Sequence, residues 1–315
     1  MDLQLSYAAR SGLQKAVRRG DLHLTKTCFD ILWADPEQRK WLFWRLPILV
    51  IEEAWHLVGE LPSFLRKHSE AERDWRAQYY YLTLSVKSKD CYAFPNGVIH
   101  PLLSQQDCPE QRLISGWLNE LSGQDPMVIA DPVFEFVLKR DPLNEYEIAA
   151  LSMLRARAFR GGKYNDRLAC VIGMLLLVSR GLDREAVKER LAADMKAHAE
   201  KPKTLDKLPW YCYDKHTRLG LLAASILEKK GVLQKHKLSM DDFKKMWTYR
   251  ESFFVPNEKL SVPKIPDQLT AFDSYWWPRL VVSMVPKTEA LRWKKLRPVV
   301  SRLIVKLQNE RKVEG

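Results

Sequence analysis

The sequence predicts an all-α protein built as a multi-helix globular bundle. Three observations carry this prediction. Apolar residues recur every three or four positions, helix start and stop signals are dense, and no alternating strand series flanks an Asn-Gly or Asp-Gly turn. With 46% hydrophobic and 29% charged residues, the 315-residue chain has the composition of a folded protein with a large core.

Helical periodicity recurs from the N-terminus to the last third of the chain. Residues three and four apart lie on one side of a helix, so each group predicts a buried helix face. Residues 79–86 are the best strand candidate, but they continue a charged helical run from Glu70, so we expect at most a short hairpin near residues 92–100. The apolar groups are Leu13, Ala16 and Val17; Phe29, Leu32 and Trp33; Leu113, Trp117 and Leu121; and Leu221, Ala224 and Leu227.

Helix boundaries are predicted from Asp-Pro pairs and glycines. Asp caps free amides at a helix start, and Pro suits the first helical position. Two capping-box spacings, Asp35 with Gln38 and Asp107 with Glu110, add to this. The Asp-Pro pairs begin at Asp35, Asp125, Asp131 and Asp141, and glycine stops are expected at Gly59, Gly123, Gly181 and Gly231.

One break divides the chain. Residues 200–209 are polar and contain two prolines, which interrupt a helix. We therefore expect a helical body over residues 1–200, with a collar-like N-terminal segment described below, and a smaller, basic helical part over residues 210–315.

Several function classes are disfavoured by the sequence. The longest strongly apolar run, residues 171–178, is too short to span a membrane, and the N-terminus lacks a secretory pattern, so we expect a cytoplasmic protein with no membrane partner. Five scattered cysteines form no Cys-x-x-Cys pair, so no metal is expected. The only Gly-Lys, at Gly162, lacks the rest of a phosphate-binding loop, so we expect neither ATP hydrolysis by that route nor a cofactor.

The charge balance favours a polyanionic partner. The net charge is +12, with an isoelectric point near 9.4. From Lys287 to Lys312, nine basic residues face only two acidic ones, while Val299, Leu303 and Leu307 recur at helical spacing. This pattern predicts a helix that docks through one face and offers phosphate contacts on the other.

Two runs near the N-terminus, Ser11–Asp21 and Trp44–Glu53, resemble the helical region that follows the ATPase core in the RarA/MgsA family of AAA+ DNA-maintenance proteins, which includes the Werner-helicase-interacting ATPase. The resemblance covers residues 7–60, and the ATPase core is absent. It implies a helical collar that drives assembly. By this resemblance the packing residues are Leu13, Val17, Trp44, Leu46 and Ile48, and the exposed or interfacial ones are Lys15, Arg18, Arg19 and Arg45. The family's Arg-Arg reads Trp44-Arg45 here.

Residues 210–220 combine aromatic and charged side chains. Aromatic rings beside cations suit single-stranded nucleic acid, and Asp214 or Thr217 is placed to cap the helix that follows. The alternative is that the aromatic residues pack a linker onto the core. If the chain is an enzyme, Asp214 and His216 are its predicted acid–base pair.

Together these patterns favour a non-catalytic, DNA-associated assembly module of DNA replication or repair, resembling the collar of RarA-like and clamp-loader proteins. It would self-associate or join an AAA+ ATPase, and contact DNA more than RNA. The alternatives are a stand-alone nucleic-acid-binding protein that uses its basic C-terminal helix, and an enzyme that uses Asp214 and His216. The predicted nucleic-acid-binding residues are Lys15, Arg18, Arg19, Lys215, Arg218, Arg292, Lys294, Lys295, Arg297, Arg302 and Lys306.

Overall fold

A computed structural model describes residues 3–53, 55–61, 81, 127–139, 142–159, 203–253 and 287–313, together with isolated helical residues between 167 and 192. Of the described residues 84% are helical and none lies in a strand, which confirms the all-α prediction. No described helix is both long and apolar enough to cross a membrane. The hairpin expected near residues 92–100, the face at residues 113–121, and the signals at Asp107, Gly123, Asp125, Asp141 and Gly181 lie outside these ranges.

The chain divides into two compact units. Unit 1 contains residues 1–42, 201–265 and 282–315, and unit 2 contains residues 43–200 and 266–281. Unit 1 therefore combines the first 42 residues with the C-terminal part of the chain. The division into a body over residues 1–200 and a smaller part over residues 210–315 stays a prediction.

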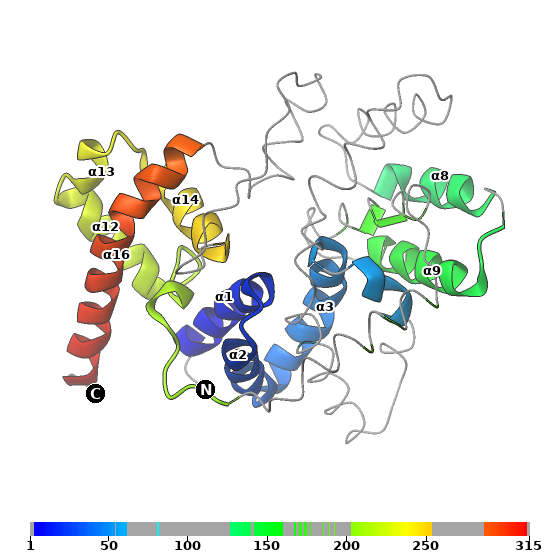
Figure 1. The fold of residues 1–315 in the computed structure, drawn as a ribbon, viewed down its shortest axis with the longest axis horizontal. Coiled ribbons are helices and arrows are strands. Elements are labelled where there is room, and N and C mark those ends of the chain that lie inside the picture. Colours follow the sequence, from blue (N-terminus) through cyan, green and yellow to red (C-terminus); the bar gives the residue numbers. More distant parts are fainter. Residues whose placement is uncertain are drawn as a thin grey trace. The chain divides into compact units, whose positions relative to one another are not determined.

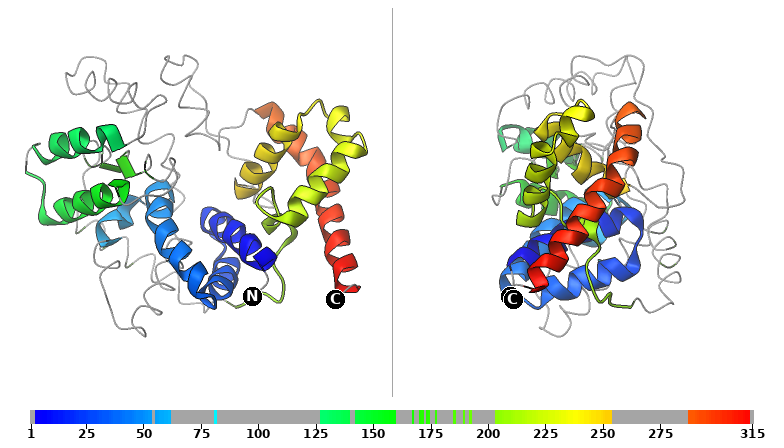
Figure 2. Two further views of the ribbon diagram at one scale, coloured as in Figure 1. Left: turned by 180° about the vertical axis from the view of Figure 1, so that it is seen from behind. Right: turned by 90° about the vertical axis from the view of Figure 1, so that its left-hand side faces the viewer.

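In unit 1 the helical pair α1 (Leu3–Arg19) and α2 (Leu22–Trp33) packs side by side, and α1 also contacts α14 (Met240–Phe253) and the short helix η3 (Trp210–Cys212). Beside them, α12 (Arg218–Lys229) contacts α13 (Val232–Lys235), α14 and α16 (Lys287–Val313) (Figures 1 and 2). The predicted faces of α1 and α2 are largely buried. On α12, Ala224 and Leu227 are buried as predicted, but Leu221 is 45% exposed and does not belong to the buried face.

The core of unit 1 is built around two buried tryptophans, Trp247 of α14 and Trp293 of α16. Phe243 lies between them, with its ring centroid 5.7 Å from that of Trp247 and 6.4 Å from that of Trp293. Aromatic rings at such separations attract one another beyond the effect of burial alone. This cluster joins α14 to α16 although they are far apart in the sequence.

Unit 2 includes the last part of α3 (Pro36–Glu53), the 3-10 helix η1 (Trp55–Glu60), and the pair α8 (Met127–Leu138) and α9 (Glu145–Phe159). Helix α9 packs on both α8 and η1. The Tyr146 hydroxyl donates to Glu60 Oε1 at 3.0 Å. Gly59 lies in η1 against the Tyr146 ring and has no positive φ, so the predicted left-handed stop there is wrong.

The boundary signals are met in part. Pro36 begins α3 and Gly231, with φ of 70°, follows α12, both as predicted. Pro132 lies inside α8, so the start predicted at Asp131 is wrong. Helix α9 is capped instead by Asn144 and Glu147, which hydrogen bond each other's backbone amides at 2.9 and 3.0 Å.

The predicted capping box at the start of α3 is half formed. Asp35 Oδ1 accepts from the Glu37 amide at 2.9 Å. Gln38 is buried, and its Oε1 accepts from Arg10 Nε of α1 at 2.7 Å instead of reaching back to the cap. The Gln38 side chain thus bonds to Arg10 of another helix and not to the backbone at the start of α3.

Candidate nucleic-acid interface

Helix α16 has two distinct faces. Trp293, Leu296, Val300 and Ile304 are buried in the unit 1 core, with Val299, Leu303 and Leu307 partly buried beside them. On the opposite side, three cations separated by seven and four residues share one face, since a helix turns every 3.6 residues. All three are exposed: Lys295, Arg302 and Lys306. They form a stripe about 16 Å long along the helix axis, which we call the α16 stripe.

Helix α13 adds further cations near one end of this stripe. His236 follows α13 and interacts electrostatically with three nearby cations, Lys235, Arg292 and Lys295. Burial and then these three cations lower the pKa of His236 below its ordinary value of 6.5. At neutral pH the ring is therefore mostly uncharged, and the cluster owes its positive charge to the lysines and the arginine.

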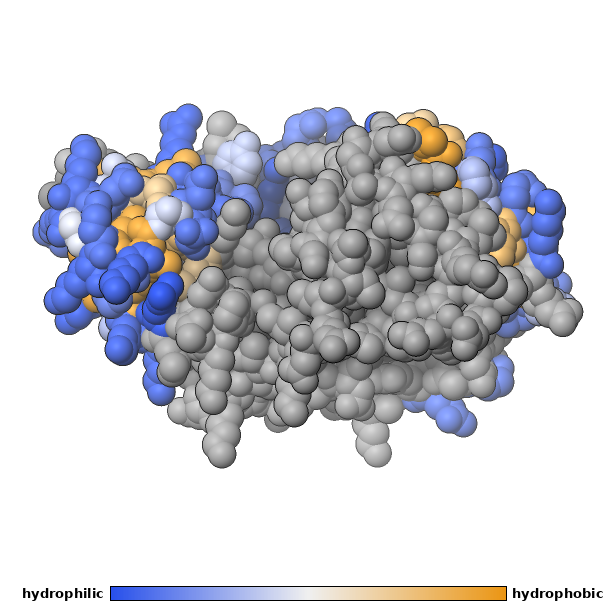
Figure 3. All heavy atoms as spheres, turned by 90° about the horizontal axis from the view of Figure 1, so that it is seen from above, coloured by the Kyte–Doolittle hydropathy of each residue, from blue (hydrophilic) through white to orange (hydrophobic). Residues whose placement is uncertain are grey.

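Basic residues dominate the exposed surface of this part of unit 1. Between residues 203 and 310, eleven described Lys and Arg residues are exposed against five Asp and Glu residues, so the surface carries a positive excess. Hydrophilic residues surround a smaller apolar patch on the part of Figure 3 that holds these helices. The exposed cations are Lys203, Lys207, Arg218, Lys229, Lys230, Lys235, Lys237, Lys294, Lys295, Arg302 and Lys306, and the exposed acids are Asp206, Glu228, Asp241, Asp242 and Glu310.

Lys15 is not part of this surface. Its side chain is 2% exposed, and its Nζ lies 2.5 Å from Asp214 Oδ2. The same ammonium donates to Ser11 Oγ at 2.7 Å and to the Tyr211 carbonyl at 2.9 Å. Lys15 is therefore buried and not exposed, because its ammonium pairs with a buried carboxylate far along the chain.

Arg19 and Arg297 are held by a second buried acid. Glu251 is fully buried, and its Oε2 lies 2.8 Å from Arg19 Nη2. Its Oε1 accepts from Arg297 Nε at 2.7 Å and from the Trp293 indole at 2.8 Å. Arg19 also donates to the Glu251 carbonyl. These two arginines are thus part of the interior network that joins α1, α14 and α16, and they do not belong to an exposed binding surface.

The aromatic residues of η3 pack against the two arginines of this network. Arg19 lies over the Tyr211 ring, 4.0 Å from its centroid, and Arg297 lies over the Trp210 ring at 5.2 Å. Burial raises the pKa of the Tyr211 phenol, although the Arg19 charge opposes this. The rings therefore pack the linker onto the core, which was the alternative to a base-stacking role.

The other predicted contacts differ in exposure. Arg218 and Lys294 are exposed, whereas Arg18, Lys215 and Arg292 are half-buried. In the collar-like segment, Leu13, Val17, Leu46 and Ile48 are buried as expected. Trp44 is 45% exposed, contrary to its expected packing role, and Arg157 lies 5.0 Å from its ring centroid. Arg45 is half-buried.

Asp214 and His216 are adjacent, as an acid–base pair requires. Asp214 Oδ1 accepts from His216 Nδ1 at 2.9 Å and from the His216 amide at 3.0 Å. Burial alone would raise the pKa of Asp214, but the charge of Lys15 and the contact with His216 outweigh burial and hold the pKa well below its usual range. The ionised carboxylate orients the His216 ring, whose side chain is 56% exposed.

Helix α12 begins directly after this pair. Thr217 caps it: its hydroxyl oxygen accepts from the Gly220 amide at 3.0 Å, and the hydroxyl donates to the Asp214 carbonyl at 2.9 Å. Thr217, one of the two residues predicted to cap this helix, is therefore its cap. The other, Asp214, forms an ion pair with Lys15.

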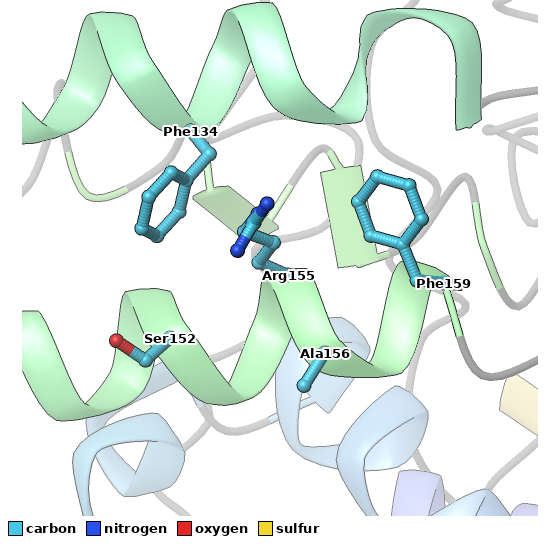
Figure 4. A pocket seen from close by; sticks show the side chains of 5 residues that line it. All are labelled: Phe134, Ser152, Arg155, Ala156 and Phe159. Atoms are coloured by element: carbon cyan, nitrogen blue, oxygen red, sulfur yellow. The ribbon is translucent and has the colours of Figure 1, made fainter.

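In unit 2, Phe134, Ser152, Arg155, Ala156 and Phe159 line a pocket of about 250 Å³ between α8 and α9. The Arg155 guanidinium lies between the two phenylalanine rings (Figure 4), 4.7 Å from the centroid of Phe134 and 5.5 Å from that of Phe159. It also forms a 2.8 Å ion pair with Asp131. Because Asp131 balances its charge, Arg155 adds no net charge to the pocket.

Lys235 and His236 were not predicted from the sequence, although the run Lys229 to Lys237 is visibly basic. Glu251 was not predicted either, because no local pattern marks it. Within the described ranges, no group of three His, Cys, Asp or Glu side chains is placed to hold a metal ion.

No protein-family model matches the chain, and neither the curated proteins nor the solved structures contain a match.

Proposed function

We propose that this protein binds nucleic acid through the α16 stripe and the neighbouring cations around His236. The observation that carries the proposal is the opposition of faces on α16: four buried apolar residues anchor the helix while Lys295, Arg302 and Lys306 point to solvent. A rigid, anchored helix holds its cations in place before binding, so less conformational entropy is lost on association.

The dimensions of the stripe suit a phosphate backbone. Duplex DNA carries about one negative charge per 1.7 Å of helix axis, so a stripe of about 16 Å faces several phosphates at once. Lys and Arg contacts to phosphate position a protein without reading base sequence. We therefore propose binding that depends strongly on salt and weakly on sequence, with DNA as the form favoured.

The test compares two triple variants that remove the same charge. K295Q/R302Q/K306Q removes the α16 stripe, whereas K40Q/K139Q/R155Q removes two exposed lysines and one exposed arginine outside the positive surface of residues 203–310. Binding of labelled single- and double-stranded DNA is measured at several salt concentrations. Each lost phosphate contact lowers the slope of log K against log salt by about 0.9 on duplex DNA, so the stripe variant is expected to lose roughly two to three units of slope.

The control variant is expected to keep the wild-type slope. Equal losses in both variants would mean that net charge, and not the stripe, drives binding. Absence of binding by the wild-type protein at low salt would overturn the proposal. Circular dichroism of both variants checks that the helices remain intact.

A second candidate function is assembly, as the collar resemblance implies. The burial of Lys15 and Arg19 removes two of the cations expected at the interface, but the exposure of Trp44 favours this role because tryptophan is enriched at protein interfaces. If Trp44 joins subunits or an AAA+ partner, Trp44→Ala lowers the oligomeric mass measured by light scattering or abolishes capture of that partner. A wild-type monomer that captures no AAA+ ATPase would remove this candidate.

A further inference from the structure

Two buried thiols of unit 1 meet beside α1. Cys28 of α2 and Cys212 of η3 are both free and fully buried. The sulfur of Cys28 lies 2.7 Å, and that of Cys212 2.8 Å, from the position that a Cβ on Gly12 would occupy. Both sulfurs therefore lie within 2.8 Å of one point, and they do so because residue 12 lacks a side chain.

The two thiols are close enough to influence each other. Burial, followed by the neighbouring Cys212 thiol, raises the pKa of Cys28. Two sulfurs beside the same glycine need side-chain rotation and approach to reach the disulfide bonding distance of about 2.05 Å. This pairing was not predictable from the sequence, because the two residues are far apart in the chain and form no recognisable spacing.

We propose that Cys28 and Cys212 are a site of reversible oxidation, at which a small peroxide closes a disulfide between α2 and η3. Two S–H bonds break and one S–S bond forms. The two electrons and two protons pass to hydrogen peroxide, whose O–O bond breaks to release two water molecules. The inference does not depend on the proposed binding of nucleic acid.

Burial sets the rate of this reaction. The thiolate is the reactive form, and a raised pKa keeps Cys28 protonated at neutral pH, so oxidation requires a local opening that exposes the pair. We expect slow oxidation of the native protein and faster oxidation at urea concentrations below the unfolding transition. Once closed, the disulfide is buried again and resists reduction until the same opening occurs.

The bond has a mechanical consequence. Cys212 precedes Asp214 by two residues, and α2 packs on α1, which carries Lys15. The disulfide would tie these segments together covalently across a loop of more than 100 residues. Constraining so long a loop in the unfolded chain is expected to raise the Tm of unit 1 by roughly 5 to 15 °C.

The experiment uses the full chain, reduced and then exposed to hydrogen peroxide. After the peroxide is removed, free thiols are alkylated in denaturant, and the digested protein is searched for linked peptides by mass spectrometry. We expect a Cys28–Cys212 peptide and a raised Tm. Cys212→Ser should abolish both changes, whereas Cys170→Ser, which removes another buried thiol, should leave both intact.

Mapping of the wild-type protein decides the question even if Cys212→Ser does not fold. Recovery of Cys28 and Cys212 as alkylated thiols, while other cysteines have been oxidised, would overturn the proposal. Pairing of either residue with Cys91, Cys108 or Cys170 would overturn it as well. A linked peptide that forms only after complete unfolding would show that the native contact does not direct the reaction, and would also count against it.

Discussion

Replacing Asp214 by Asn should destabilise unit 1 strongly. The carboxylate is fully buried and accepts four hydrogen bonds, including that from the Lys15 ammonium at 2.5 Å. The substitution leaves Lys15 as a buried cation without a counter-charge. Removing one member of a buried ion pair costs about 3–5 kcal/mol of unfolding free energy. For a unit of this size that corresponds to a Tm lower by roughly 10–20 °C.

The assay is urea unfolding followed by tryptophan fluorescence, with hydrogen exchange of α1 and α12 to locate the effect in unit 1. Glu37→Gln is the matched control, since it also converts an acid to its amide in an ion pair, but its side chain is 73% exposed. We expect a loss of about 0.5 kcal/mol or less from it. The double variant Lys15→Met with Asp214→Asn should recover part of the stability, because the unpaired cation is gone. An Asp214→Asn protein no less stable than Glu37→Gln would refute this reasoning.

The same pair predicts a response to acid. The pKa of Asp214 in the folded protein lies well below its unfolded value of about 4. A depressed pKa contributes stability that is fully present above the unfolded pKa and is lost as the pH falls below it toward the folded pKa. The difference in unfolding free energy between wild type and Asp214→Asn should therefore be constant from pH 5 to 7 and shrink below about pH 4. A difference that grows on acidification would contradict the ion pair.

The remaining predictions concern other contacts of unit 1. Glu251→Gln should cost about 3 kcal/mol or more in urea unfolding, because Arg19 and Arg297 lose their shared counter-charge; a loss under 1 kcal/mol would contradict the network. Thr217→Ala should cost about 1 kcal/mol by removing the cap of α12, whereas Thr217→Ser should restore it. The pKa of His236, followed by NMR, should lie below 6.5 in the free protein and rise when DNA is added, because bound phosphates favour the charged ring. An unchanged pKa would place the DNA elsewhere.

The candidate interface was predictable only where helix periodicity decides exposure. The cations Lys295, Arg302 and Lys306 recur opposite an apolar face of their own helix, and this local pattern survives folding. The sequence did not distinguish them from Arg297, because both kinds of residue lie in one basic run. Arg297 is only partly exposed and pairs with Glu251, a partner that no spacing within the C-terminal helix reveals.

The all-α class and the placing of apolar and basic residues on different sides of α16 were predictable from the sequence, because these depend on interactions within a few residues. The choice of Thr217 over Asp214 as the cap of α12 was not. The contacts between distant segments were not predictable: Lys15 is buried against Asp214, and Cys28 lies beside Cys212 at Gly12. Helical periodicity gives the direction in which a side chain points on its own helix, but not what lies opposite. That is set by which distant segment packs there, and a buried opposite charge or a missing Cβ then determines the role of the residue.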